Sequence, residues 1–301
     1  MKKNYPRDMI GYGSKTPVIK WPNGAKIALQ IVLNYEEGAE NCVLHGDKMS
    51  EVFLSEIIGA QPIKGRHINM ESFYEYGSKR GFWRLHELFQ KKKIPITIFG
   101  VGMALERNKD VCDAIKESDY EVASHGWRWI DYQKIPKKIE KKHMQLAIQS
   151  IKKIFGKRPL GWYTGRCSPN TRDLVMEEGG FLYDSDSYSD DLPYWITKGK
   201  KKQLIIPYTL DNNDMRFATN QGFNSGDQFF TYLKDSFDAL YEEGNTNPKM
   251  MSVGLHCRLI GRPGRMQSLK KFLDYVLKHD DVWLCKRIDI AKHWIKNYSN
   301  I

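Results

Sequence analysis

Residues 27–38 carry the stretch that decides the fold, Ile-Ala-Leu-Gln-Ile-Val-Leu-Asn-Tyr-Glu-Glu-Gly. Its first seven residues are apolar except for Gln30, and this short run predicts a buried strand over 27–33. Glu36 and Glu37 follow the strand, and Gly38 lets the chain turn sharply after them. Adjacent acids are usually only surface charge. Behind a buried strand, however, at least one should point inward, where burial would raise its pKa toward that of a general base.

Short apolar runs recur along the chain and alternate with helical patterns. The other predicted strands lie at 96–101, 121–124, 161–164, 181–183, 204–207, 251–255 and 282–285. The predicted helices lie at 74–92, 136–155, 225–242, 265–278 and 288–298. This alternation predicts an α/β fold, either a (β/α) barrel or a doubly wound sheet. Residues 38–70 fit the alternation poorly and are interpreted as an insertion with one short helix near 49–58.

Titratable side chains gather directly after several of these strands. They are Glu36, Glu37, His125, Arg166, Asp184, Asp186, Asp211, Asp214, Arg216, His256 and Arg258. Because α/β folds place their active sites at the carboxyl ends of parallel strands, this recurrence favours a catalytic site over ordinary loop polarity. His125 or His256 alone could be a core histidine, but two of them after different strands favour acid–base chemistry. Arg166 could be surface charge, although its Gly and Ser-Pro neighbours suggest a loop that presents a guanidinium to a carboxylate or oxyanion.

The composition predicts one domain that binds neither nucleic acid nor membrane. Apolar residues make up 41% of the 301 positions, and the longest apolar stretch is too short to span a bilayer. The net charge of +11 invites a nucleic-acid interpretation, but the lysines fall in short groups on the polar sides of predicted helices, and no binding motif is present. Five widely spaced cysteines are typical of reduced thiols. Since no signal-peptide-like apolar run lies near the N-terminus, a cytoplasmic location is expected.

Longer motifs resemble those of the polysaccharide-deacetylase (NodB-homology) superfamily, over nearly the whole chain. They lie at 7–13 (Arg-Asp-Met-Ile-Gly-Tyr-Gly), 34–47, 99–108, 124–132 (Ser-His-Gly-Trp-Arg-Trp-Ile-Asp-Tyr), 161–166 (Gly-Trp-Tyr-Thr-Gly-Arg), 183–186, 213–218 and 254–265. The resemblance implies a deformed (β/α) barrel of about seven strands in a single domain over 1–301. Its core would lie at about 71–287, with the first strand and carboxylate motif at 26–38 and the insertion at 38–70. Within the superfamily the chain is similar to the urate-catabolism allantoinase branch, which implies hydrolysis of allantoin to allantoate by a homo-oligomer, expected to be a tetramer.

Departures from the pattern of the metal-dependent deacetylases decide the expected chemistry. Their first motif has two aspartates, a general base and a metal ligand, where this chain has Glu36 and Glu37. Their second motif has two histidines four residues apart, where this chain has His125 and Trp129. An indole cannot bind a divalent cation, so neither a metal nor another cofactor is expected.

The resemblance also implies a role for each site residue. By position, Glu36 would be the base and His256 the acid, with His125 as a further catalytic residue. Asp214 (or Asp211) would be the carboxylate that supports a histidine, and Arg166 would orient Glu36. The residues expected to contact substrate are Glu37, Trp129, Arg166, Asp211, Arg216 and Arg258. The ring nitrogen that leaves allantoin lies between two carbonyls and departs as a ureido nitrogen, so a base, an acid and oxyanion donors could suffice without a metal.

Three other functions stay open at this point. A peptidoglycan or chitin-like N-deacetylase of the same fold would need a metal and access to the cell surface. A cyclic amidase for another hydantoin or imide would differ only in pocket details that a sequence does not show. A barrel that has lost catalysis would serve as a binding protein, inert toward small cyclic amides but able to bind a ligand tightly.

Overall fold

The computed structural model describes residues 5–301, and its centre is a nine-stranded sheet. The strands are β1 (Ile27–Tyr35), β2 (Ile96–Gly100), β3 (Glu121–Ser124), β4 (Gly161–Trp162), β5 (Tyr183–Asp184), β6 (Tyr194–Lys198), β7 (Lys201–Ile205), β8 (Lys249–His256) and β9 (Val282–Leu284). Strand β1 pairs in parallel with β2, β8 and β9. From β2 the sheet continues in parallel through β3, β4, β5 and β7, and β6 pairs antiparallel with β7 at the edge.

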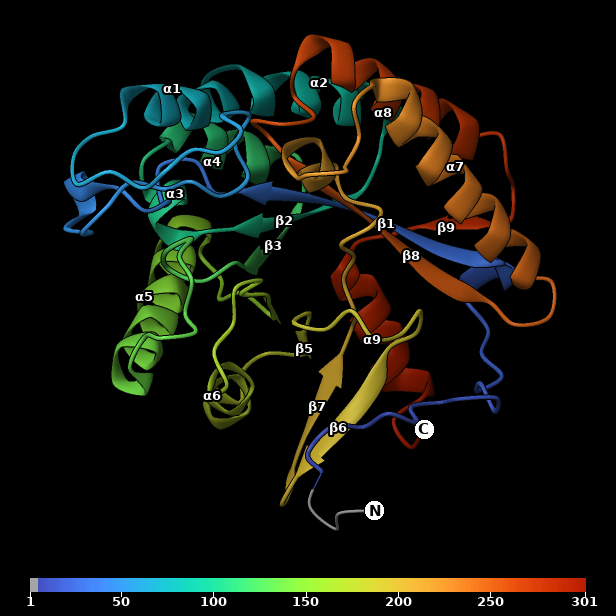
Figure 1. Cartoon of the computed structure of the whole chain (residues 1–301). Helices are drawn as coiled ribbons and strands as arrows, with labels where there is room; N and C mark the ends of the chain where they lie inside the picture. The colour runs from blue at the N-terminus through green and yellow to red at the C-terminus, as the bar shows by residue number, and fades with distance from the viewer. Residues whose placement is uncertain (1–4) are drawn as a thin grey trace.

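The helices lie on the outer side of this curled sheet, except for the last one, which packs with the inward-facing Ala28 and Val32 of β1 (Figure 1). They are α1 (Ile68–Tyr76), α2 (Phe82–Lys92), α3 (Gly102–Glu106), α4 (Lys109–Glu117), α5 (Lys137–Phe155), α6 (Thr171–Glu178), α7 (Gly226–Glu243), α8 (Pro263–Val276) and α9 (Arg287–Asn297). Short turns η1 (Pro22–Gly24), η2 (Val43–His45), η3 (Gly77–Gly81) and η4 (Asp214–Ala218) complete the elements. In Figure 1, α1, α2, α7 and α8 lie along the upper side of the sheet, and α5 and α6 lie at its lower left.

Both faces of β1 are covered, which explains why its sequence is almost entirely apolar. The odd-numbered side chains from 27 to 35 pack toward the helices, whereas Ala28 and Val32 pack inside the curled sheet. The same alternation continues beyond the end of the strand. It directs Asn34 and Glu36 to the inside and Glu37 to the helix side.

A buried arginine spans the seam where the curled sheet meets itself. Among residues 5–301, the isolated bridge between Asn213 and Gly254 is the strand-like pairing that joins the chain after β7 to β8. Arg287, at the start of α9, is fully buried beside this seam and donates to the side chains of Gln30 on β1 and Ser252 on β8, both at 2.8 Å. It also donates to the backbone carbonyls that follow β7. One side chain therefore links strands that a regular barrel would join by backbone pairing.

The predicted α/β class and the deformed barrel are confirmed, with β8, β1, β2, β3, β4, β5 and β7 as its parallel strands. Strand β6 was not predicted, because its residues are half-buried or exposed and show no buried apolar run. The short helix expected near 49–58 is wrong, since those residues form turns and bends. There the Glu51 carboxylate accepts the backbone N–H groups of Val52 and Phe53, local bonds that compete with a helix. The helix expected over 74–92 is divided between α1 and α2 by the π turn η3.

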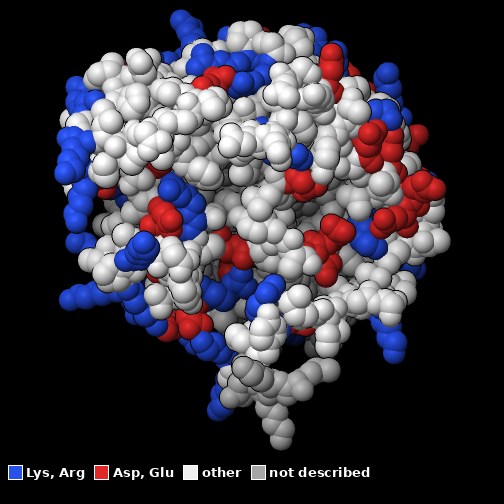
Figure 2. All heavy atoms as spheres, in the orientation of Figure 1, with Lys and Arg blue, Asp and Glu red and all other residues white. Residues whose placement is uncertain are grey.

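Charged side chains of both signs lie on the visible face of the molecule. Figure 2 shows Lys and Arg around the periphery of that face, with Asp and Glu between them and toward its right-hand side. In the described part of the chain, no helix is long and apolar enough to cross a membrane.

Candidate active site

A cavity of about 120 Å³ lies where β1, β3, β4 and β8 end. Its polar lining residues are Asn34, Glu36, His125, Arg166, Asn213 and His256. Its other lining residues are mostly aromatic or apolar and include Phe53, Leu54, Trp129, Tyr163, Tyr188, Tyr208 and Met215. The structure thus brings together residues from four strand ends, at the place where parallel α/β folds carry their active sites.

Glu36 lines this cavity and is 1% exposed. Its Oε1 is 3.2 Å from Nε2 of His125 and 3.5 Å from Nε2 of His256, and its Oε2 accepts from Nη1 of Arg258 at 2.7 Å. Burial raises the pKa of Glu36, but the charges of Arg258 and His256 and the hydrogen bonds from both histidines outweigh burial. The pKa of this carboxyl therefore lies well below its usual range, and Glu36 is ionised at neutral pH.

His256 is the best-supported proton donor in the cavity. Its Nδ1 lies 2.6 Å from Oδ1 of the fully buried Asp214, and its Nε2 faces Glu36. Burial alone lowers the pKa of His256, but the negative charges of Glu36 and Asp214 outweigh burial and raise it to about 9. The imidazole is therefore protonated at neutral pH, with one N–H directed at each carboxylate.

His125 stands on the other side of Glu36. Its Nδ1 lies 3.2 Å from the backbone oxygen of Tyr163, which fixes the ring so that Nε2 faces Glu36. The ring also packs against that of Tyr163, with centroids 4.9 Å apart. Both histidines thus direct the same ring nitrogen toward one carboxylate oxygen.

The arginine that holds Glu36 is Arg258 rather than Arg166. Arg258 is fully buried, and its Nε donates to the backbone oxygen of Leu54 at 3.2 Å. Its guanidinium carbon lies 4.3 Å from the ring centre of Tyr74 and 4.9 Å from that of Trp129. A cation between two aromatic faces is stabilised without water, so Arg258 can remain charged beside Glu36.

Arg166 lines the cavity, and its guanidinium pairs with the segment 38–70, which forms part of the cavity wall. Its Nη1 donates to Glu51 at 3.2 Å, and its guanidinium carbon lies 5.0 Å from the ring of Trp129 and 5.2 Å from that of Phe53. Among the described residues, Glu51 is the hydrogen-bond partner of its guanidinium, and the side chain is 20% exposed. Arg166 therefore retains donors that can meet a ligand.

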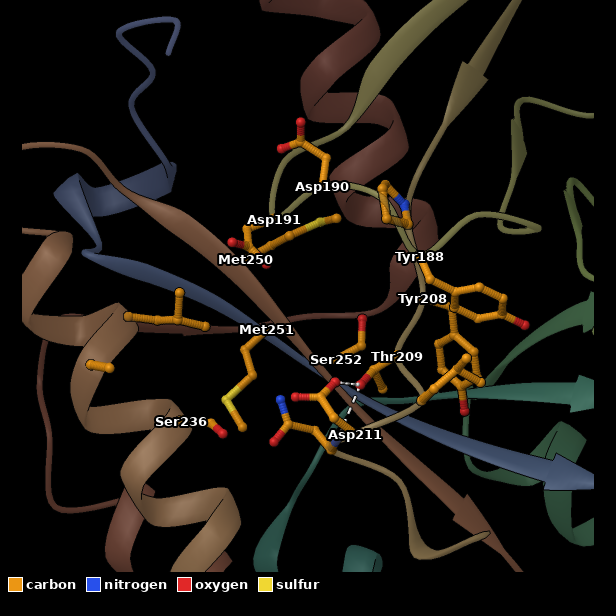
Figure 3. A pocket seen from close by; sticks show the side chains of 15 residues that line it. Tyr188, Asp190, Asp191, Tyr208, Thr209, Asp211, Ser236, Met250, Met251 and Ser252 are labelled. Atoms are coloured by element: carbon orange, nitrogen blue, oxygen red, sulfur yellow. Dashed lines mark hydrogen bonds between the residues drawn. The ribbon is translucent and has the colours of Figure 1, made fainter. Parts of the chain in front are cut away.

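Asp211 and Arg216 do not line this cavity. Asp211 is exposed and accepts hydrogen bonds from Thr209 at 2.8 Å and from Tyr232 at 3.2 Å. It faces a separate cavity of about 470 Å³, which it shares with Asp190 (Figure 3). Arg216 lies over the ring of Tyr232, 5.3 Å from its centre. The loop after β7 turns Asp214 inward and these two side chains outward, so the structure supports neither as a substrate contact.

Glu37 also lies outside the cavity, on the helix side of the sheet. Its Oε2 accepts the backbone N–H of Glu36 at 3.0 Å, and its Oε1 is 3.7 Å from Nη1 of Arg258. A β carbon added at Gly77 would lie 2.2 Å from this Oε1, so the carboxyl packs directly on the π turn η3. Burial raises the pKa of Glu37 to about 7, with Arg258 opposing the rise and Glu36 adding to it. The expectation of a raised pKa concerned a carboxyl that points into the site; the carboxyl that does so, Glu36, has a lowered pKa, and the raised pKa belongs to Glu37, outside the cavity.

Several cavity residues could not be singled out from the sequence. Asn34, a polar residue directly after an apolar run, carried a weak signal, and its Nδ2 donates to the hydroxyl of Tyr208 at 3.1 Å. Tyr163 and Tyr208 line the cavity by tertiary placement alone. Glu51 holds Arg166 from the segment 38–70, which no strand-end argument reaches.

The metal site of the related deacetylases does not fit these residues. Trp129 occupies the position of their second histidine and packs on Phe53, with ring centroids 5.9 Å apart and 19° between the planes. Arg258 places a cation 2.7 Å from Glu36 and 3.7 Å from Glu37, the carboxylates at the positions of the base and of the metal ligand. Within residues 5–301, no group of three or more His, Cys, Asp or Glu side chains is arranged to hold a metal ion.

Comparisons with known proteins agree with this fold. Residues 70–177 match the family described as polysaccharide deacetylase. A Schizosaccharomyces pombe protein whose name places it among the polysaccharide deacetylases is 43% identical over 309 residues, covering 96% of each chain.

Two crystal structures are similar over almost their whole length. A Pseudomonas aeruginosa PAO1 protein described as a probable polysaccharide deacetylase is 59% identical, with a TM-score of 0.96, and the match covers 98% of this chain and 99% of that one. PuuE allantoinase is 57% identical, with a TM-score of 0.97, and the match covers 99% of this chain and 100% of that one.

Proposed function

The chain belongs to the polysaccharide deacetylase superfamily, a group of hydrolases, and from that premise we propose that it opens the hydantoin ring of allantoin to give allantoate without a metal. The observation that carries this proposal is the 57% identity to PuuE allantoinase over 99% of this chain. The cavity adds chemical support, because it pairs an ionised carboxylate with a protonated histidine.

The two groups can divide the hydrolysis between them. Glu36 accepts a proton from a water molecule as that water attacks the ring carbonyl carbon. His256 then donates its Nε2 proton to the ring nitrogen as the carbon–nitrogen bond breaks. The nitrogen leaves as part of a urea group, a better leaving group than the amine expelled from an N-acetyl sugar.

The same geometry allows the site to return to its starting state. Oε1 of Glu36 lies 3.5 Å from Nε2 of His256, so the proton taken from water can pass to the histidine after the product leaves. The new carboxylic acid ionises and releases one proton, which balances the reaction. Asp214 keeps Nδ1 of His256 protonated throughout, so that Nε2 is the atom that gains and loses the proton.

The low pKa of Glu36 limits its strength as a base in the free protein. A substrate that enters between Glu36 and His256 would replace their direct contact, which is one cause of that low pKa. The charge of Arg258 and the hydrogen bond from His125, which also lower this pKa, stay in place. Basicity would therefore rise when substrate is bound.

The shape of the cavity favours a small substrate over a sugar polymer. The cavity is about 120 Å³ in volume, and Phe53 and Leu54 from the segment 38–70 form part of its wall. Arg166 offers guanidinium donors for a ring carbonyl or for the carboxylate that forms when the ring opens.

N-deacetylation of an acetylated sugar is the second candidate, since two of the relatives carry the name polysaccharide deacetylase. A panel of substrates separates the candidates. It should contain allantoin, unsubstituted hydantoin, a cyclic imide and N-acetylglucosamine oligomers. We expect hydrolysis of allantoin with a kcat/KM well above that for the other three. Turnover confined to the oligomers would assign the chain to the deacetylases, and a preference for hydantoin or imide would assign it to another cyclic amide.

A further inference from the structure

Arg258 faces two buried carboxyl groups, of which one lines the cavity. Its Nη1 is 2.7 Å from Oε2 of Glu36 and 3.7 Å from Oε1 of Glu37. Because these glutamates are neighbours in the chain, their side chains leave the backbone on opposite sides. Arg258 lies where it can reach both.

The charges around Arg258 balance without Glu37. Among the groups in direct contact, Glu36 and Asp214 are negative and Arg258 and His256 are positive, while the buried Glu40 is acted on by Arg107 as well as by Arg258. An ionised Glu37 would therefore add an uncompensated negative charge to a buried cluster. Isolated buried charges are costly. The pKa of Glu37, raised by burial to about 7, agrees with a carboxyl that changes its charge near neutral pH.

We propose that Glu37 is a positioning residue that acts through Arg258, competing with Glu36 for the guanidinium and so setting how strongly Glu36 attracts a proton. The inference rests on the proposed hydrolysis by Glu36 and His256. When Glu37 is neutral, the charge of Arg258 acts fully on Glu36 and weakens it as a base. When Glu37 is ionised, that charge is shared, and Glu36 becomes the stronger base.

Glu37 is held in this position rather than free to enter the cavity. The backbone N–H of Glu36 bonds to Oε2, and the π turn η3 packs on Oε1 at Gly77. Two further titratable groups face Glu37, Tyr35 and Cys257. Burial raises the pKa of the Tyr35 hydroxyl and of the Cys257 thiol well above their usual values, so both groups stay neutral while Glu37 titrates.

The test is the pH dependence of kcat/KM for allantoin between pH 5 and 10. For the wild-type protein we expect a rise through about pH 7, where Glu37 ionises. Glu37→Gln keeps the shape of the side chain but cannot ionise, so this rise should disappear. At pH 8, kcat should fall about three- to tenfold while KM stays within about twofold, because a weaker base slows proton transfer and leaves the cavity wall unchanged.

Two further variants separate this role from simple stability. Glu140→Gln removes another buried carboxyl, one that contacts Ser168 and Thr171 rather than Arg258, and should keep the rise near pH 7. Gly77→Ala keeps the acid but displaces Oε1 of Glu37, so the midpoint of the rise should move. If Glu37→Gln does not fold by circular dichroism, Gly77→Ala and the wild-type profile decide the question.

The outcomes distinguish this inference from the proposed function. A wild-type protein that does not hydrolyse allantoin removes the basis of both. Allantoin turnover with a flat profile through pH 7, or a rise that persists in Glu37→Gln, overturns the role of Glu37 and leaves the proposed function standing.

Discussion

Asp214 binds His256 at two points. Its Oδ1 lies 2.6 Å from Nδ1 of the ring, and its Oδ2 accepts the backbone N–H of the same residue at 2.8 Å. Oδ2 also accepts the backbone N–H of Ile260 at 3.0 Å, so the carboxylate fixes the whole turn that follows β8. The orientation of the ring and its positive charge therefore depend on one buried side chain.

Asp214→Asn is expected to lower kcat for allantoin by about 10²-fold, within the range that a positioned acid contributes. The amide carries no charge to hold the proton on His256, so the alkaline limb of the pH profile should also move to lower pH. Steady-state kinetics between pH 6 and 10 measure both effects. Asp211→Asn is the matched control, because Asp211 is exposed and lies on the separate cavity. Equal losses in the two variants would contradict the pairing of Asp214 with His256 as the source of the acid.

The alkaline limit of activity should follow His256. Its folded pKa is raised to about 9, so the protonated acid is present below that pH and lost above it. The kcat/KM for allantoin is therefore expected to fall as the pH rises through about 9. This histidine's contribution to stability, complete below its unfolded pKa of about 6.5, should decline above that pH and be lost by about pH 9. A fall centred near the ordinary histidine pKa of about 6.5 would exclude His256 as the acid.

Arg258 is expected to be a large contributor to stability. Arg258→Met leaves Glu36 buried without its cation, and breaking one side of a buried pair typically costs about 3–5 kcal/mol. Urea unfolding measures the free energy directly. Arg66→Met is the control, since Arg66 is 52% exposed in its pair with Glu71, and such surface pairs contribute about 0–1 kcal/mol. Similar losses of unfolding free energy in both variants would mean that the buried ion pair with Glu36 contributes no more than a surface ion pair.

Arg166→Ala should weaken substrate binding more than it slows the reaction. The guanidinium lines the cavity but touches neither Glu36 nor His256, so KM should rise by about tenfold, the value of one charge-assisted hydrogen bond. Arg216→Ala removes an arginine that lies over Tyr232 outside the cavity, and its KM should stay within about twofold of the wild type. If only Arg216→Ala raises KM, the substrate binds elsewhere.

The strands could be predicted because burial on both faces leaves a continuous apolar run. The runs at 27–33 and 96–101 reappear as the fully buried strands β1 and β2. The edge strand β6 (Tyr194–Lys198) was not predicted, because its residues are half-buried or exposed and form no continuous apolar run. The turns near Glu51 were wrongly predicted as a helix because the side chain–backbone bonds that replace helical bonds there have no recognisable sequence pattern.

The sequence predicted which strand ends carry the site residues, but not which side chains pair with one another there. Glu36, His125 and His256 converge because parallel strands end at one edge. Which arginine meets Glu36 depends on the fold of a turn after β8, so Arg258 rather than Arg166 could be identified only from the structure. The same holds for the choice of Asp214 over Asp211, which the loop after β7 decides.

The most direct test of the central claim is allantoin hydrolysis by purified protein, with and without EDTA, with the metal content measured on the same sample. We predict that turnover persists after EDTA treatment, that bound metal is well below one ion per chain, and that Glu36→Gln abolishes most of the activity. Loss of turnover on EDTA treatment with recovery on adding a divalent cation, or activity restricted to N-acetylated sugars, would contradict the account.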